Sequence, residues 1–186
     1  MLLFVGLGNP SPDSENNRHN IGFKIIDAIN QKFGLSKQKP KFKGLLTTGN
    51  INNKKIYAIK PLTFMNNSGI CIRELLEYFK IDSENVIVFH DDLDIDFGKV
   101  KAKFGGSNAG HNGVESIDKF IGKEYSRVRV GIGKPNSQIT VTDYVLKNFD
   151  EDEIQKLKKI TINITDSLSI LLDKKLDLFS STVNNK

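Results

Sequence analysis

Apolar residues occur in short runs along the chain, and the runs differ in pattern. Two are continuous, at residues 2–5 and 86–89, which is typical of strands covered on both faces. Two others alternate apolar and polar positions, at residues 99–104 and 127–132, as expected of strands with one covered face. The pattern therefore predicts four strands.

Two further strands and several helices complete the predicted elements. Residues 45–51 and 55–60 flank Asn52-Asn53, a typical hairpin turn. Apolar residues at helical spacing predict the helices, which cover residues 21–33, about 72–79, 114–121, 140–149 and 151–172. The tail from Asp177 is weakly specified, and we expect it to fray.

Strands that alternate with helices predict an α/β fold, and the hairpin makes the sheet mixed rather than purely parallel. We expect a single domain over residues 1–186, with a twisted mixed β-sheet flanked by helices on both faces.

The composition fits a soluble chain, with 38% apolar and 26% charged residues. It has no run of about 18 apolar residues and no basic leader before an apolar stretch, so it predicts neither a membrane span nor an export signal. The single cysteine, Cys71, lies on an apolar helix face and is expected to be a buried structural thiol. One cysteine cannot form an internal disulfide, which favours a cytoplasmic location.

Positive charge is concentrated in one part of the chain. The formal net charge is +5, and residues 99–134 hold eight basic and three acidic residues. A local basic patch favours a polyanionic partner such as a nucleic acid. The alternative is a solvated surface of a lysine-rich protein.

Polar residues suited to hydrolysis lie in loops at the edges of predicted strands and helices. They are His19, His90, His111, Asn9, Asn66, Asp91 and Asn112. Histidine can take a proton from water, a carboxylate can orient its ring, and carboxamides can stabilise an oxyanion. The set predicts attack of water on a carbonyl with a good leaving group, such as an ester.

Two other kinds of site are less well supported. The group His90, Asp91, Asp92 and Asp94 could instead hold a metal ion. A serine nucleophile is unsupported, because the chain has no Gly-x-Ser-x-Gly motif.

Several motifs resemble those of the bacterial-type peptidyl-tRNA hydrolases, in the family's order over residues 1–150. They are Val5-Gly6-Leu7-Gly8-Asn9-Pro10, Arg18-His19-Asn20, Thr63-Phe64-Met65-Asn66-x-Ser68-Gly69, His90-Asp91-Asp92-Leu93-Asp94, Gly105-Gly106 with Gly110-His111-Asn112-Gly113, Arg127-x-Arg129-x-Gly131-Ile132-Gly133 and Asp143-Tyr144-Val145-Leu146.

The resemblance implies a monomeric enzyme without a metal or other cofactor, which cleaves the ester between a peptide and the 3′ end of tRNA. It implies His19 as the general base and Asp91 as its partner. The residues expected to position the substrate are Asn9, Met65, Asn66, His111 and Asn112. Those that match the family's clamp for the tRNA 5′-phosphate are Lys101, Lys103 and Arg129, which lie in the basic patch.

A few positions depart from the family's pattern. Ser11 and Ser14 replace a glycine and a tyrosine, Asn17 replaces a threonine, and Ile95-Asp96 replaces Leu-Pro.

Two other functions stay open. One is a tRNA- or RNA-binding module that has lost hydrolysis, and the other is a phosphorylase or nucleosidase on a similar sheet.

Overall fold

Strand β1 (Leu2–Gly6) lies in the middle of a seven-stranded sheet, because both of its faces are apolar. The structure, a computed structural model, describes residues 1–186. The other strands are β2 (Lys39–Lys41), β3 (Gly44–Ile51), β4 (Lys54–Pro61), β5 (Val86–Asp92), β6 (Val100–Phe104) and β7 (Ser126–Gly131). The helices are α1 (Ile21–Phe33), α2 (Ser68–Phe79), α3 (Asn112–Ile121), α4 (Val141–Val145), α5 (Glu151–Asp166), α6 (Leu168–Leu172) and α7 (Leu176–Asn184). Four 3₁₀ turns, η1 (Pro12–Ser14), η2 (Arg18–Asn20), η3 (Met65–Asn67) and η4 (Ser83–Asn85), link them.

The sheet is mixed, as predicted, with the strand order β2-β3-β4-β1-β5-β7-β6. The central strands β4, β1, β5 and β7 are parallel, whereas β2, β3 and β6 pair in antiparallel fashion at the two sides. The carboxyl ends of the parallel strands therefore meet at one edge of the sheet, where binding sites form in open α/β folds.

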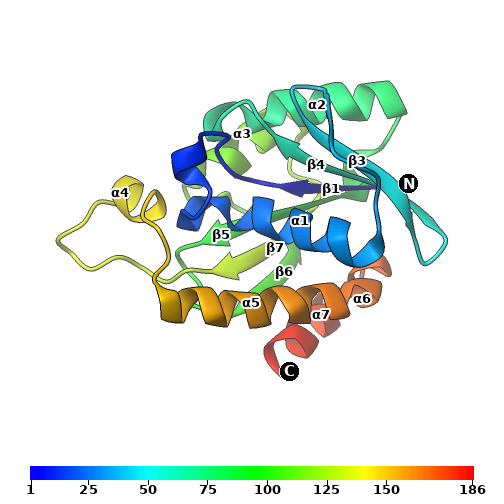
Figure 1. The fold of residues 1–186 in the computed structure, drawn as a ribbon. Helices are drawn as coiled ribbons and strands as arrows, with labels where there is room; N and C mark the ends of the chain where they lie inside the picture. The colour runs from blue at the N-terminus through cyan, green and yellow to red at the C-terminus, as the bar shows by residue number, and fades with distance from the viewer.

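Helices cover both faces of the sheet (Figure 1). Residues such as Leu3 and Val5 of β1 pack with α2 and α3, and the alternate residues Leu2 and Phe4 pack with α1 and the C-terminal helices. None of the helices combines the length and the hydropathy needed to cross a membrane.

Two glycines bring the start of α1 directly onto the sheet. A Cβ atom at Gly6 would lie 2.2 Å from the carbonyl oxygen of Gly22, and one at Gly22 would lie 2.4 Å from that of Phe89. Neither site has room for a side chain, because real Cβ atoms do not approach so closely. This contact places η2, the turn before α1, beside the end of β5.

The C-terminal third of the chain differs from the prediction. The helix expected over residues 140–149 is only α4, because the chain after it extends and forms a bridge between Asn148 and Asn17. The helix expected over residues 151–172 is divided at Ser167, where no glycine or proline signals a break.

The tail forms a helix, α7, rather than irregular chain. Phe179 and Val183 are buried, and Ser180 and Asn184 accept hydrogen bonds from the backbone N–H groups of β6. These two side chains therefore bind backbone N–H groups of the edge strand β6 that have no partner strand on that side. Whether this end moves in solution stays a prediction.

Candidate active site

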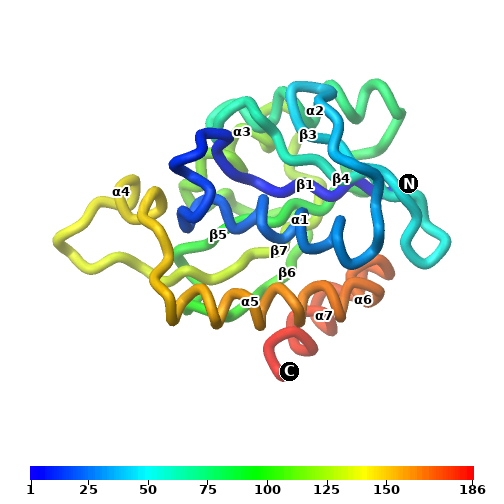
Figure 2. The backbone as a smooth tube through the Cα atoms, viewed as in Figure 1, coloured from blue at the N-terminus to red at the C-terminus, as the bar shows by residue number.

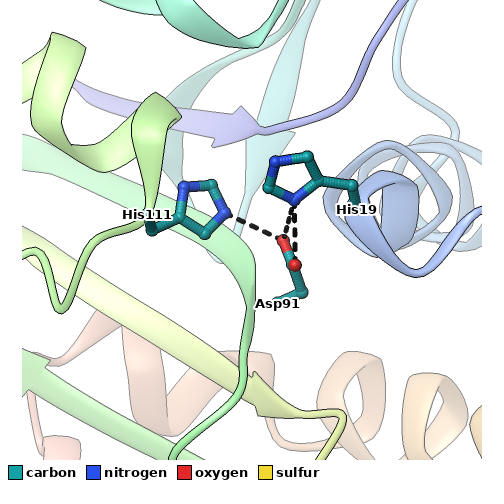
Figure 3. Close-up of side chains that lie close together, drawn as sticks. All are labelled: His19, Asp91 and His111. Carbon is teal, nitrogen blue, oxygen red and sulfur yellow. Dashed lines mark hydrogen bonds and ion pairs between the residues drawn. The ribbon is translucent and has the colours of Figure 1, made fainter. Parts of the chain in front are cut away.

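Asp91 joins two histidines at the carboxyl edge of the sheet (Figure 3). It is the second-last residue of strand β5, whereas His19 comes from η2 and His111 is the residue before α3. Nδ1 of His19 is 2.9 Å from Oδ2 of Asp91, and Nε2 of His111 is 2.8 Å from Oδ1. The imidazole rings of the two histidines lie 4.7 Å apart between centroids.

The hydrogen bonds determine which ring nitrogens carry protons. Nδ1 of His111 accepts hydrogen bonds from the backbone N–H groups of Gly113 and Val114, so its proton must be on Nε2, which donates to Asp91. His19 donates to Asp91 through Nδ1, which leaves its Nε2 as an unprotonated acceptor. Figure 3 shows this second nitrogen on the side of the ring away from Asp91.

Charge and burial set the protonation states of the group. Burial lowers the pKa of His19, but the Asp91 carboxylate offsets this effect and raises the pKa above 6.5. Burial would raise the pKa of Asp91, yet the two imidazoles hold it well below its usual range. Asp91 is therefore a carboxylate at neutral pH, and it favours the imidazolium form of His19.

Asn9 is held at the same edge by a reciprocal pair of hydrogen bonds with Asn20. The backbone N–H of Asn9 donates to Oδ1 of Asn20, and Nδ2 of Asn20 donates to the carbonyl of Asn9, both over 2.9 Å. Oδ1 of Asn9 accepts from the backbone N–H of Met65. Because an N–H can only donate, the orientation of the Asn9 amide is defined, and its Nδ2 group is directed elsewhere as a donor.

The other predicted substrate residues differ in their surroundings. Met65 is buried, and a Cβ atom at Gly113 would lie 2.4 Å from its sulfur. Asn66 and Asn112 are exposed at the starts of α2 and α3. His111 uses both ring nitrogens within the protein, so a contact with substrate would involve its ring carbons.

The alternative metal set is not brought together. Consecutive residues of β5 face opposite sides of the sheet, so His90 and Asp92 point away from Asp91. Asp92 pairs with Arg129 and Asp94 with Lys134. The group whose ligand atoms are close enough for one ion is His19, Asp91 and His111, where hydrogen bonds already link the same atoms.

The predicted phosphate clamp lies on two paired strands. Lys101 of β6 is opposite Arg129 of β7, and Lys103 is opposite Arg127, so all four cations share one face. Burial lowers the pKa of Lys103, and the neighbouring Arg129 and Arg127 lower it further. Nε of Arg129 donates to Asp92, which leaves its terminal nitrogens for another anion.

Arg127, one of the eight basic residues of the patch at residues 99–134, does not lie on the surface. It is 1% exposed, and its guanidinium donates to Asp118 and to the carbonyl of Ser107. It therefore fastens α3 and the glycine-rich loop to β7. Hydrogen bonds also link Arg18, Asn17 and Asn20 to the surroundings of His19, although the sequence predicts no separate role for them. The only signal for such a role in the sequence is that these residues flank His19.

Comparisons with known proteins agree on one family. The family model described as "Peptidyl-tRNA hydrolase" matches residues 3–186. A peptidyl-tRNA hydrolase of Pelagibacter ubique (strain HTCC1062) is 81% identical over 186 residues, which is 100% of each chain. One from Bartonella henselae is 45% identical over 99% of this chain and 95% of its own. The crystal structure of peptidyl-tRNA hydrolase from Acinetobacter baumannii is 31% identical, has a TM-score of 0.92, and matches 99% of this chain and 94% of that one.

Proposed function

This chain belongs to the peptidyl-tRNA hydrolase family, and we propose that it hydrolyses the ester between a peptide and the 3′ end of tRNA with His19 as general base. The observation that carries this assignment is the hydrogen bond from Nδ1 of His19 to Asp91, which leaves Nε2 free to accept a proton. A tRNA-binding module would need neither the base nor its carboxylate.

The reaction follows from these atoms. Nε2 of His19 takes a proton from water as the water oxygen bonds to the ester carbonyl carbon. Asp91 stabilises the resulting imidazolium without itself taking the proton. The tetrahedral intermediate then collapses, the bond from carbon to the ribose oxygen breaks, and the imidazolium returns the proton to that oxygen. The products are the free peptide and tRNA with a free terminal hydroxyl.

Carboxamides are suited to stabilise the negative charge that develops on the carbonyl oxygen. The amide of Asn9 is fixed as a donor by Met65, and such preorganised donors cost little reorganisation during the reaction. We assign Asn66 and Asn112, which are exposed at neighbouring helix starts, to contacts with the peptide and the terminal adenosine.

The cations of the clamp extend the site toward the tRNA. Lys101 is exposed, and Lys103 lies beside it on the same face as Arg129. Contacts with the 5′-phosphate would fix the position of the acceptor end without reading its sequence. We further propose that the enzyme acts as a cytoplasmic monomer. We also propose that it needs no metal or other cofactor, because the base, the carboxylate and the amides form a complete set for the reaction.

Turnover of an N-acetylated aminoacyl-tRNA by wild type and His19→Ala tests the assignment. We expect kcat to fall by about 10²–10⁴ in the variant, because it lacks the general base. Its circular dichroism and Tm should show a folded protein. Turnover near the wild-type rate in the folded variant would exclude His19 as the base.

A further inference from the structure

Arg18, the residue before His19, is buried, and its guanidinium is surrounded by carbonyls, a carboxylate and aromatic rings of residues 144–153. One terminal nitrogen donates to the backbone carbonyls of Lys147 and Asn148, over 3.0 and 2.6 Å. The other donates to both carboxylate oxygens of Glu153, over 2.7 and 3.0 Å. The guanidinium also lies 4.7 Å from the ring centroid of Tyr144 and 5.2 Å from that of Phe149.

The backbone beside Arg18 is fastened to the same segment. The N–H of Arg18 donates to the carbonyl of Lys147, and the N–H of Phe149 donates to the carbonyl of Asn16. The side chain of Asn17 donates to that of Asn148 over 2.8 Å. Residues 16–18 and 147–149 thus form a short two-stranded contact. Figure 2 shows where the chain that carries α4 returns to the start of α5, beside the N-terminal turns.

The three residues of η2 therefore bind three different parts of the molecule. Arg18 binds the start of α5, His19 binds Asp91 on β5, and Asn20 binds Asn9 on the loop after β1. Glu153 is itself fixed, because its carboxylate also accepts from the backbone N–H of Asp150 in the capping box of α5. The support for Arg18 is thus a helix terminus rather than a mobile side chain.

Because the turn is so short, a movement at Arg18 must change the position of the next residue. We propose that Arg18 is a positioning residue for the general base: it holds η2 against residues 147–153 so that Nδ1 of His19 stays in hydrogen-bond contact with Asp91. The proposal rests on the proposed function, in which His19 is the base. Under this proposal, residues 147–149, which connect α4 to α5, also help to hold the active site in place.

Loss of this support should act on His19 in a recognisable way. The charged and titratable groups that face His19 are Asp91 on β5 and His111 before α3. If η2 loosens, the weaker contact with Asp91 lowers the pKa of His19, whereas the gain of solvent relieves burial and raises it. Because the effect of Asp91 outweighs that of burial in the intact site, the loss of both returns the pKa from its raised value toward 6.5. The acid limb of the profile of kcat against pH then moves to lower pH.

The test compares Arg18→Met and Arg18→Lys with a control of similar stability. Methionine keeps the unbranched apolar stem, and lysine keeps the charge but has one nitrogen in place of the two that bind the carbonyls and the carboxylate. Leu171→Ala, a core substitution in α6, serves as the control for lowered Tm. Glu153→Gln keeps an acceptor for Arg18 and for the N–H of Asp150 but removes the charge.

The readouts are kcat, KM and the pKa of His19, the last followed by NMR of the ring. We expect kcat of Arg18→Met to fall about 10- to 100-fold, as for a small misplacement of a catalytic group, with KM nearly unchanged. Arg18→Lys should recover part of kcat, Glu153→Gln should lose less than Arg18→Met, and the pKa of His19 should fall in both Arg18 variants.

Three results would overturn the proposal: an unchanged pKa of His19 in the folded variants, a loss confined to KM, or an equal loss of kcat in Leu171→Ala. If Arg18→Met does not fold, the same criteria apply to Arg18→Lys. The pKa is measured without turnover, so it tests the link from Arg18 to His19 even if the wild type fails to hydrolyse the tRNA ester. That failure would count against the proposed function instead.

Discussion

Replacement of Asp91 by asparagine changes one oxygen of the central group into an NH₂ group, at almost constant size. His111 must still donate through Nε2, because its Nδ1 accepts from the backbone at the start of α3. The asparagine oxygen should therefore take the place of Oδ1, which lies 2.8 Å from Nε2 of His111. Its NH₂ group then takes the place of Oδ2, which at 2.9 Å is the nearer of the two oxygens to Nδ1 of His19, Oδ1 lying at 3.0 Å.

An NH₂ group at that place favours the tautomer of His19 in which Nδ1 accepts and Nε2 carries the proton. That tautomer cannot take a proton from water through Nε2. We expect kcat of Asp91→Asn to fall by about 10²–10⁴, as for a base held in the wrong tautomer, with little change in KM. The loss corresponds to about 2.7–5.4 kcal/mol of transition-state stabilisation.

The acid limb of the profile of kcat against pH should also move, to lower pH. Asp91 raises the pKa of His19 against the effect of burial, so without the carboxylate burial should leave this pKa below 6.5. The profile of kcat against pH, measured on an N-acetylated aminoacyl-tRNA, reports both effects. Asp94→Asn is the matched control, because it removes an exposed carboxylate of the same segment that pairs only with Lys134 at 3.4 Å.

Two results would refute this reasoning. A kcat of Asp91→Asn within about threefold of that of Asp94→Asn would show that the carboxylate does not control the tautomer of His19. A loss confined to KM would make Asp91 a binding residue.

Three other predictions test separate parts of the structure. Gly113→Ala should destabilise the fold by about 1–3 kcal/mol and lower kcat, because the new Cβ would lie 2.4 Å from the sulfur of Met65 and 3.2 Å from Cε1 of His111. Denaturant unfolding and kcat measure these effects, and unchanged values would mean that α3 moves freely. Lys101→Ala with Lys103→Ala should lower kcat/KM for full tRNA substrates and flatten its salt dependence by about 0.7–0.9 log units per lost phosphate contact, but spare a minimal ester of adenosine. Arg129 is kept in this variant because its loss would leave the buried carboxylate of Asp92 without a cationic partner, and equal losses on both substrates would contradict the clamp. Burial and the neighbouring His111 lower the pKa of His90 to about 3, so the contribution of neutral His90 to stability should be present above pH 6.5 and lost as the pH falls toward 3. As the pH falls below 6.5, the free energy of unfolding should therefore decrease less steeply in His90→Phe than in wild type. His19 has the opposite effect, but it is present in both proteins and does not alter the comparison. Equal slopes in the two proteins would refute the prediction.

The sequence predicted the parts of the fold that depend on local periodicity. The continuous runs at residues 2–5 and 86–89 are central strands, and Asn52-Asn53 forms the turn between β3 and β4. The break at Ser167 and helix α7 were missed, because both depend on tertiary contacts. The apolar positions of α7 are few, and its stability comes from Phe179 in the core and from bonds to β6.

The candidate site shows the same division. The sequence placed His19 and Asp91 among the polar residues at the edges of predicted strands and helices, and the family resemblance implied that they act together, although 72 positions separate them. The roles of His111 and Arg18 could not, since they depend on which atoms are already bonded. Arg127 shows the converse: alternation placed it correctly on the polar face of β7, but at this position α3 covers the face and Asp118 binds the guanidinium.

Strand β5 also relates the two halves of the proposed site. Consecutive residues of a strand point to opposite faces, so Asp91 turns toward His19 and Asp92 turns toward Arg129. Under the proposed function, the base that cleaves the ester and the cation that holds the 5′-phosphate are thus fixed by neighbouring residues of one central strand. Because β5 is paired on both sides, with β1 and β7, it has little freedom to change the distance between them. A substrate whose 5′-phosphate and 3′ ester are separated as in an intact acceptor end can then engage both sites at once, and the binding energy of the phosphate serves to place the ester beside His19.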